Sequence, residues 1–347
     1  MSQLIAIAVG PVQDFIAAAR RTRDLWLGSH LLSEVSQAVA IEVENNGGKL
    51  IFPATTKAGN VANIILAELP DGDPKEVVRK AREAAQERWL EFADDAFDEA
   101  SKVIREDIWN EQVKDVIEFY AAWVTRSDNY KNDREKVMRL LAGRKRFRDF
   151  QPANGRAGVP KSSLDGQRES VLKDPAREPW SDRVQSSLRV REGEQLDVIA
   201  LVKRVAGGKR SYPSVARIAA DPWVRRNQDR LDPVINACRE IGNQIIRPLN
   251  ASDYPQFQPF PFEGTAVYTS RHHELIEETG AKKESIQSLQ EALEEWPEPE
   301  PYLAVLVADG DKLGAALSKL DSPEKHRESS LDNAAPILSP SATSTAR

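Results

Sequence analysis

Two aspartates follow an apolar run near the end of this 347-residue chain, in the stretch YLAVLVADGDKLGAAL. Asp309 and Asp311 stand two positions apart, so on an extended backbone their carboxylates project to the same side, about 6–7 Å apart. Mg²⁺ takes oxygen ligands and commonly uses one or two carboxylates together with phosphate oxygens. The Gly310 carbonyl would be a third oxygen. The spacing indicates a Mg²⁺ or Mn²⁺ site, and the alternative is a strand-to-helix turn in which Asp311 is the N-cap.

Two basic segments have the chemistry to contact nucleic acid. RRTRDLW places Arg20, Arg21 and Arg23 close to a tryptophan. GRKRFRDF interleaves cations with two phenylalanines, and such aromatic rings can stack on bases while the cations neutralise phosphates. The cations of this second segment are Arg144, Lys145, Arg146 and Arg148. The alternative for both segments is a solvated helix face.

Other residues of metal-binding or nucleophilic type do not form a recognisable site. The single cysteine, Cys238, excludes a disulfide framework and a thiolate zinc site within this chain. His272 and His273 are adjacent but lack the spacing of a zinc-binding helix, and we interpret them as surface residues. No zinc is expected.

The composition is that of a globular protein, with 40% hydrophobic and 29% charged residues. The net charge of −6 argues against a globally basic nucleic-acid binder and leaves room for a local basic patch. No apolar run approaches the length of about 20 residues that a membrane helix requires. We therefore expect a cytoplasmic protein without a membrane partner.

The pattern of apolar residues predicts a β-α-β-β-α order of elements in the first hundred residues. These elements would position the candidate residues of the N-terminal part. LIAIAVG (4–10) reads as a strand buried on both faces, and a helical pattern follows it. Two short strands are predicted at 49–53 and 60–69, and helix from 75 to about 124. This order predicts an α+β fold with a ferredoxin-like palm (βαββαβ).

Composition divides the chain into four expected parts. The palm is predicted over residues 1–105, and residues 196–205 read either as a strand that completes it or as the start of a buried helix. A mainly helical middle region with a loop insert follows at 106–298. Residues 299–330 begin a new part, with the apolar run before Asp309 as its first strand, and resemblance to a known family, rather than composition, implies that this part is the start of a second palm. Residues 331–347, which are small and polar, are predicted to be disordered.

The segment GPVQDFIAAARRTRDLWLGSHLLS resembles the opening of the first palm in the large subunit of type III-B CRISPR effector complexes, the Cmr complexes. NVANIILAEL and YPSVARIAADPW are similar to later blocks of that family, and PYLAVLVADGDKLG resembles the first strand of its second, cyclase-like palm. The similarity runs in order from about Leu4 to Leu320.

This resemblance implies an RNA-guided antiviral complex that contains other Cmr subunits, guide RNA and target RNA. In the family, the second palm makes cyclic oligoadenylate from ATP with two metal ions. Asp309 and Asp311 match the catalytic metal ligands. Gly10, Gln13, Ser29 and Gly310 match the nucleotide-binding positions.

The chain also departs from the family pattern. It has no His-Asp dipeptide of an HD nuclease domain, and Ser162 and Ser163 stand where relatives often carry zinc-binding cysteines. The GGDD hairpin that should complete the catalytic site is absent, so we expect a prematurely terminated large subunit whose synthase activity is incomplete. The alternatives are a standalone cyclase-like nucleotidyltransferase and a non-catalytic scaffold for an RNA complex.

Overall fold

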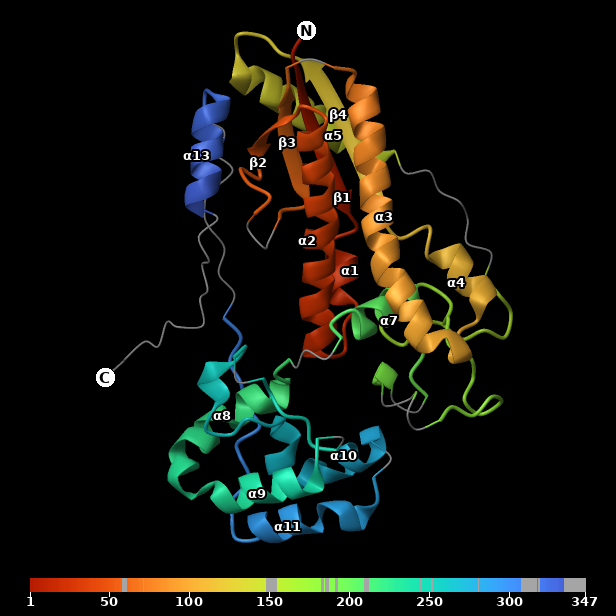
Figure 1. Cartoon of the computed structure of the whole chain (residues 1–347), viewed down its shortest axis with the longest axis vertical. Helices are drawn as coiled ribbons and strands as arrows, with labels where there is room; N and C mark the ends of the chain where they lie inside the picture. Colours follow the sequence, from red (N-terminus) through yellow and green to blue (C-terminus); the bar gives the residue numbers. More distant parts are fainter. Residues whose placement is uncertain are drawn as a thin grey trace.

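A four-stranded antiparallel sheet and the helices that cover it make up the first part of the chain (Figure 1). The computed structural model describes residues 1–57, 61–70, 72–147, 155–181, 184, 187–190, 193–208, 212–243, 245–250, 252–279, 281–306, 317 and 319–333. The strands are β1 (Gln3–Gly10), β2 (Lys49–Phe52), β3 (Ile64–Leu69) and β4 (Glu118–Thr125).

The central strand β1 explains why its sequence is an uninterrupted apolar run. It pairs with β3 on one side and with β4 on the other, and Ile5 lies opposite both Ala67 and Trp123. Successive side chains of a strand point to opposite faces. The odd-numbered residues of β1 therefore enter one core and the even-numbered residues enter another, as predicted for a strand buried on both faces.

Two long helices cover one face of the sheet. They are α2 (Thr22–Asn45) and α3 (Pro74–Ala100). Trp89 of α3 is completely buried, and its indole Nε1 donates to the Val113 carbonyl at 2.9 Å. Its ring meets Phe15 edge-on. Phe15 belongs to the short helix α1 (Gln13–Ala17), so the same core fixes α1 at the end of β1.

The opposite face is covered by α5 (Tyr130–Arg146), and α13 (Pro323–Asn333) packs beside β2 (Figure 1). Tyr130, Val137 and Leu141 of α5 meet the even-numbered side chains of β1 in a second core. His326 of α13 stacks on Phe52, with the ring centroids 6.3 Å apart. This helix therefore brings the last described residues back onto the first sheet.

The strand order β2-β3-β1-β4 is that of a ferredoxin-like unit. The predicted α+β class and βαββαβ palm are therefore confirmed, but the last strand comes from Glu118–Thr125, inside the segment predicted to be helical. Of the two alternatives for residues 196–205, the completing strand is not found and the buried helix is. Residues Val198–Val205 form the helix α7, and the Asp197 side chain caps it by accepting from the Ala200 amide at 2.8 Å.

A second, helical region has a core of its own. Trp223, Phe260 and Leu289 are among the residues of this core, and none of its members belongs to the cores of the sheet. Between the two regions, α4 (Glu106–Gln112) follows α3. The helices of the second region are α8 (Val215–Asn227), α9 (Asp232–Ile241), α10 (His272–Thr279) and α11 (Gln287–Leu293).

The start of the predicted second palm is described only in part. Residues 301–306 form no strand, and the side chains of Tyr302 and Leu306 are largely exposed, so the expected buried strand is not found in this described portion. No described segment pairs with these residues, and a strand requires a partner for its backbone hydrogen bonds. The predicted disordered tail starts at 331, but α13 continues to Asn333, and the remainder lies outside the described residues.

None of the helices in the described part of the chain combines the length and the apolarity that crossing a bilayer demands.

Candidate nucleotide-binding cavity

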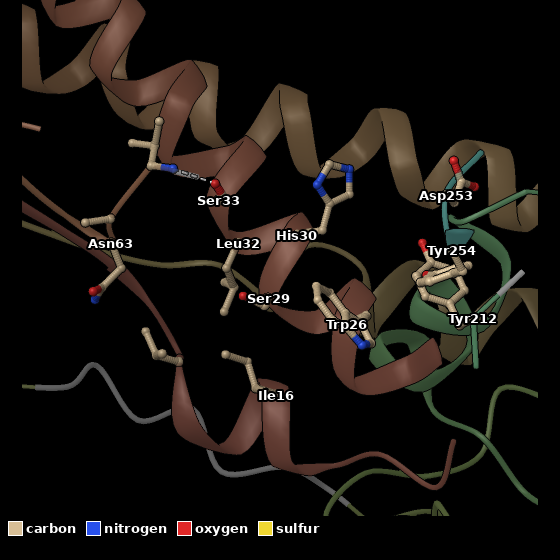
Figure 2. Close-up of a pocket in the computed structure, with 13 residues that line it drawn as sticks. Ile16, Trp26, Ser29, His30, Leu32, Ser33, Asn63, Tyr212, Asp253 and Tyr254 are labelled. Atoms are coloured by element: carbon tan, nitrogen blue, oxygen red, sulfur yellow. Dashed lines mark hydrogen bonds between the residues drawn. The ribbon is translucent and has the colours of Figure 1, made fainter. Parts of the chain in front are cut away.

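A cavity of about 750 Å³ opens where the palm meets the loops next to the helical region. This volume is within the usual range of about 300–1,000 Å³ for small-molecule sites. Its lining residues come from α1, α2, the segment before β3 and two loops distant in sequence: Val12, Ile16, Trp26, Ser29, His30, Leu32, Ser33, Val61, Ala62, Asn63, Tyr212, Asp253 and Tyr254. In the view of Figure 2, Trp26, Tyr212 and Tyr254 lie on one side of this space and Asn63 lies on the other.

The floor of the cavity depends on a close approach between α1 and α2. A Cβ atom at Gly28 would lie 3.2 Å from Ile16 Cα and 3.4 Å from Lys203 Cδ, so a larger residue would push the helices apart. The Lys203 ammonium donates to the carbonyls of Phe15, at 2.6 Å, and Ala18. This contact satisfies carbonyls at the end of α1 and holds that helix against α7.

Hydrogen bonds fix the segment that precedes β3. The Val61 amide donates to Ser33 Oγ at 2.7 Å, the bond drawn in Figure 2. Asn63 Nδ2 donates to the Val9 carbonyl at 3.2 Å, and the Val9 amide donates to the Asn63 carbonyl at 2.9 Å. The wall formed by residues 61–63 is thus attached to both α2 and β1.

Trp26, Tyr212 and Tyr254 form an aromatic wall of the cavity, and the buried cation Arg23 helps to position Tyr212. Arg23 Nη2 donates to the Gly208 carbonyl at 2.8 Å, and the guanidinium lies 5.2 Å from the centre of the Tyr212 ring. Burial lowers the pKa of Arg23 to about 10. The Thr22 hydroxyl donates to the Pro213 carbonyl at 2.8 Å, so the start of α2 holds the loop that carries Tyr212.

A fully buried ion network supports the start of α2 from behind. Arg204 Nε donates to Asp24 Oδ1 at 2.8 Å, and Arg204 Nη2 lies 3.1 Å from Glu194 Oε1. Burial lowers the pKa of the neighbouring Lys203 to about 8. The network joins α7 to the turn from which Trp26 and Ser29 project.

Of the three nucleotide-binding positions predicted in the first palm, only one lines the cavity. Ser29 is exposed and lines the cavity. Gly10 ends β1 and Gln13 is exposed at the start of α1, and neither belongs to the lining. The geometry therefore brings Ser29 to the candidate site and leaves Gly10 and Gln13 beside it.

The predicted metal site cannot be placed, because Asp309, Gly310 and Asp311 lie outside the described residues. Within the part of the chain that the structure describes, no group of three His, Cys, Asp or Glu side chains could hold a metal ion. The Mg²⁺ or Mn²⁺ prediction remains a prediction. Ser163 Oγ accepts from the Gln195 amide at 2.9 Å, and the Ser162 amide donates to the Arg168 carbonyl at 2.8 Å, so both serines take part in hydrogen bonds that hold the local loop.

The two basic segments have different surroundings. Arg23 is only 3% exposed, so its expected contact with RNA is corrected to a structural role, in which it holds α2 to the carbonyls of Arg204 and Gly208 at the end of α7. Arg20 is exposed and Arg21 is half-buried at the N-cap of α2. In the second segment, Arg144, Lys145 and Arg146 are all exposed in the last turn of α5, and Arg148 lies outside the described residues.

Sequence reasoning missed the aromatic residues of the cavity. Tyr212 and Tyr254 both precede a proline, in YPS and YPQ. A residue before proline has fewer accessible backbone conformations, because the helical region is disfavoured there, so a Tyr-Pro pair presents its ring from a stiffened loop. This repeated pair was the signal that could have predicted the aromatic wall.

Comparison with known proteins agrees with the resemblance seen in the sequence. Residues 4–94 match the family model of the CRISPR-associated protein Cmr2, N-terminal region. A chain of the type III-B Cmr-beta structure in the apo state superposes with a TM-score of 0.59 and 14% identity, over 91% of this chain. No curated protein sequence matches significantly.

The fold is therefore similar to that of the Cmr-beta chain. The chain matches the N-terminal Cmr2 family model over residues 4–94. It covers 45% of the length of the Cmr-beta chain. Other matches include Cmr-beta bound to cognate target RNA (TM-score 0.47, 14% identity, 67% of this chain and 38% of that one) and a Csm1–Csm4 cassette with pppApA (TM-score 0.27, 16% identity, 42% and 19%).

Proposed function

We propose that this chain acts as a large-subunit component of a type III-B CRISPR RNA-guided effector complex in the cytoplasm, together with the other Cmr subunits, guide RNA and target RNA. The match of residues 4–94 to the Cmr2 family is the observation that carries this proposal. The ferredoxin-like strand order and the superposition on a Cmr-beta chain support it.

Within that role, the cavity binds an adenine nucleotide. Trp26, Tyr212 and Tyr254 offer aromatic faces to a base. Ser29 and His30 on α2 offer polar groups to a ribose or phosphate. Synthesis of cyclic oligoadenylate would additionally need the Asp309 and Asp311 carboxylates with their metal ions, so nucleotide binding at the cavity is the part of the function that these residues support.

Titration calorimetry with ATP and Mg²⁺ tests the nucleotide proposal. The Ser29→Tyr variant would fill the cavity from the exposed side of α2, and we expect ATP to bind at least tenfold more weakly to it than to the unmodified chain. Ser101→Tyr is the matched control, because Ser101 is exposed beyond the end of α3 and outside the cavity.

Two results would contradict the nucleotide proposal: absence of ATP binding to the unmodified chain, or equal affinity in the Ser29→Tyr variant. Membership of the complex is tested separately by co-expression with the other Cmr subunits and a guide RNA. We expect the chain to co-purify with them, and a chain that elutes alone would refute the assignment.

A further inference from the structure

The outward face of α5 carries an excess of positive charge that no described carboxylate neutralises. Between Tyr130 and Arg146 the sequence has seven cations and two acids, in a chain of net charge −6. One of the acids, Asp133, is buried and bonded to Arg126 at 2.7 Å. The exposed cations are Lys131, Lys136, Arg139, Arg144, Lys145 and Arg146.

These exposed cations have no anionic partner among the described residues, whereas two cations of α3 do. Arg79 bonds both Glu76 and Glu83 at 2.6 Å, and Arg88 bonds Glu34 at 2.6 Å and Glu91 at 2.5 Å. An exposed helix of this fold can thus pair cations with nearby carboxylates, and α5 does not pair its exposed cations in this way.

Helix stability explains only part of this charge. Cations in the last turn stabilise the carbonyl end of a helix, and this accounts for Arg144, Lys145 and Arg146. The effect fades beyond the last turn, so it does not account for Lys136 and Arg139. At 100° per residue, Lys136, Arg139 and Arg146 lie on the side away from Val137 and Leu141, which face the sheet.

The row of cations ends in an exposed aromatic ring. Phe147 is the C-cap residue of α5 and is 74% exposed. From Lys136 to Arg146 the helix rises by about 15 Å, at about 1.5 Å per residue. A stripe of this length with an aromatic ring at one end matches a single nucleic-acid strand, in which phosphates follow the cations and a base stacks on the ring.

We propose that the outward face of α5, defined by Lys136, Arg139, Arg146 and Phe147, binds the backbone of single-stranded nucleic acid. The surface lies on the face of the sheet opposite α2 and α3, so it is separate from the nucleotide cavity (Figure 1). Its ligand is recognised by phosphate charge and base stacking. Binding is therefore tolerant of sequence, and it does not depend on nucleotide binding in the cavity.

Fluorescence anisotropy of the full chain with labelled 20-nucleotide oligouridylate and oligodeoxythymidylate tests the proposal. The triple variant Lys136→Gln, Arg139→Gln, Arg146→Gln should bind at least tenfold more weakly at low salt. The slope of log affinity against log salt concentration should fall by about 2, since each phosphate contact on a single strand contributes about 0.7. Phe147→Ala should weaken binding about fivefold or more without changing the slope.

The matched control is Lys75→Gln, Lys102→Gln, Lys114→Gln, which makes the same change in net charge at exposed lysines away from α5. We expect it to retain the affinity of the unmodified chain, and circular dichroism should show that all variants are folded. Equal weakening in both triple variants would mean that overall charge governs binding and would overturn the proposal. So would absence of binding by the unmodified chain, or tighter binding of an acidic peptide than of either oligonucleotide. The two oligonucleotides distinguish RNA from DNA as the ligand.

Discussion

At the scale of single residues, the fold depends on charged side chains placed where solvent is excluded. Arg204 has no exposed side-chain surface and bonds two carboxylates that are equally buried, Asp24 and Glu194. Its Nη1 also donates to the Arg189 carbonyl at 2.6 Å. A buried charge is tolerated only where partners of this kind satisfy it.

Arg204→Met is predicted to destabilise the chain by about 3–5 kcal/mol, because two buried carboxylates would lose their cation. Urea denaturation followed by circular dichroism measures the change. Arg79→Met is the matched control. Arg79 also bonds two carboxylates, but all three groups are about half exposed and screened by solvent, so a much smaller change than for Arg204→Met is expected. Equal effects in the two variants would show that the buried network contributes no more than a surface one.

Such residues are also where prediction from the sequence was least complete. Arg23 stands in a run of charged residues that suggests exposure, and packing against α7 and Gly208 buries it. Ser29 was predicted from resemblance and lines the cavity. Tyr212 and Tyr254 come from loops far along the chain, so no local pattern places them near Ser29.

At the scale of elements, α13 is attached to the sheet by few and mostly polar contacts. His326 is buried between Phe52 and Tyr130, and its Nδ1 lies 2.7 Å from Tyr130 Oη. Ser330 Oγ accepts from the Ala54 amide at 3.2 Å. Burial first, and the nearby Arg134 charge second, lower the pKa of His326 to about 4.

Docking of α13 is therefore predicted to weaken with acidification. Because the pKa of His326 is lower in the docked state than the usual 6.5, docking is complete above about pH 6.5. It loses stability as the pH falls toward about 4, by roughly 1–3 kcal/mol. Hydrogen exchange of the α13 amides at pH 7 and pH 5 measures this loss.

The matched variant is His326→Gln, which keeps a hydrogen-bonding side chain and does not titrate. Its α13 amides should show the same relative protection at both pH values after correction for intrinsic exchange rates. If the variant and the unmodified chain lost protection equally at pH 5, another group would be responsible for the change.

Elements with long or strongly patterned sequences were predictable, and short apolar ones were not. The run at 4–10 and the helical pattern after it correspond to β1 and α2. EFYAAWVT and DVIALVKRV are both short and apolar, and periodicity alone does not separate strand from helix at this length. Pairing with β1 makes the first a strand, and the Asp197 cap makes the second a helix.

At the scale of the whole molecule, the sheet and the helical region have separate hydrophobic cores. The helical core contains one unusually close approach: a Cβ atom at Gly264 would lie 2.2 Å from the Arg217 amide nitrogen. Arg217 is itself completely buried on α8 and bonds Asp221 at 3.0 Å. A substitution of Gly264 should therefore destabilise the helical region and leave the sheet unchanged.

Gly264→Ala is predicted to destabilise the helical region by about 1–3 kcal/mol through overpacking. Hydrogen exchange should become faster in α8, α9 and α11, with no change in β1 or α2. Gly143→Ala is the control, since nothing lies within 4 Å of a Cβ atom there. It should leave exchange in the helical region unaltered. Acceleration in β1 equal to that in α8 would contradict the separation of the cores.

The walls of the cavity come from both sides of this division: Trp26 and Ser29 project from the palm, whereas Tyr254 comes from the chain between α9 and α10. Any molecule that fills it must hold the two bodies in one relative orientation. By mass action, a ligand present at 100 times its dissociation constant would favour that orientation by about 2.7 kcal/mol. A bound ligand would then restrict the relative motion of the palm and the helical region, so that ligand concentration sets how stiffly the two are joined.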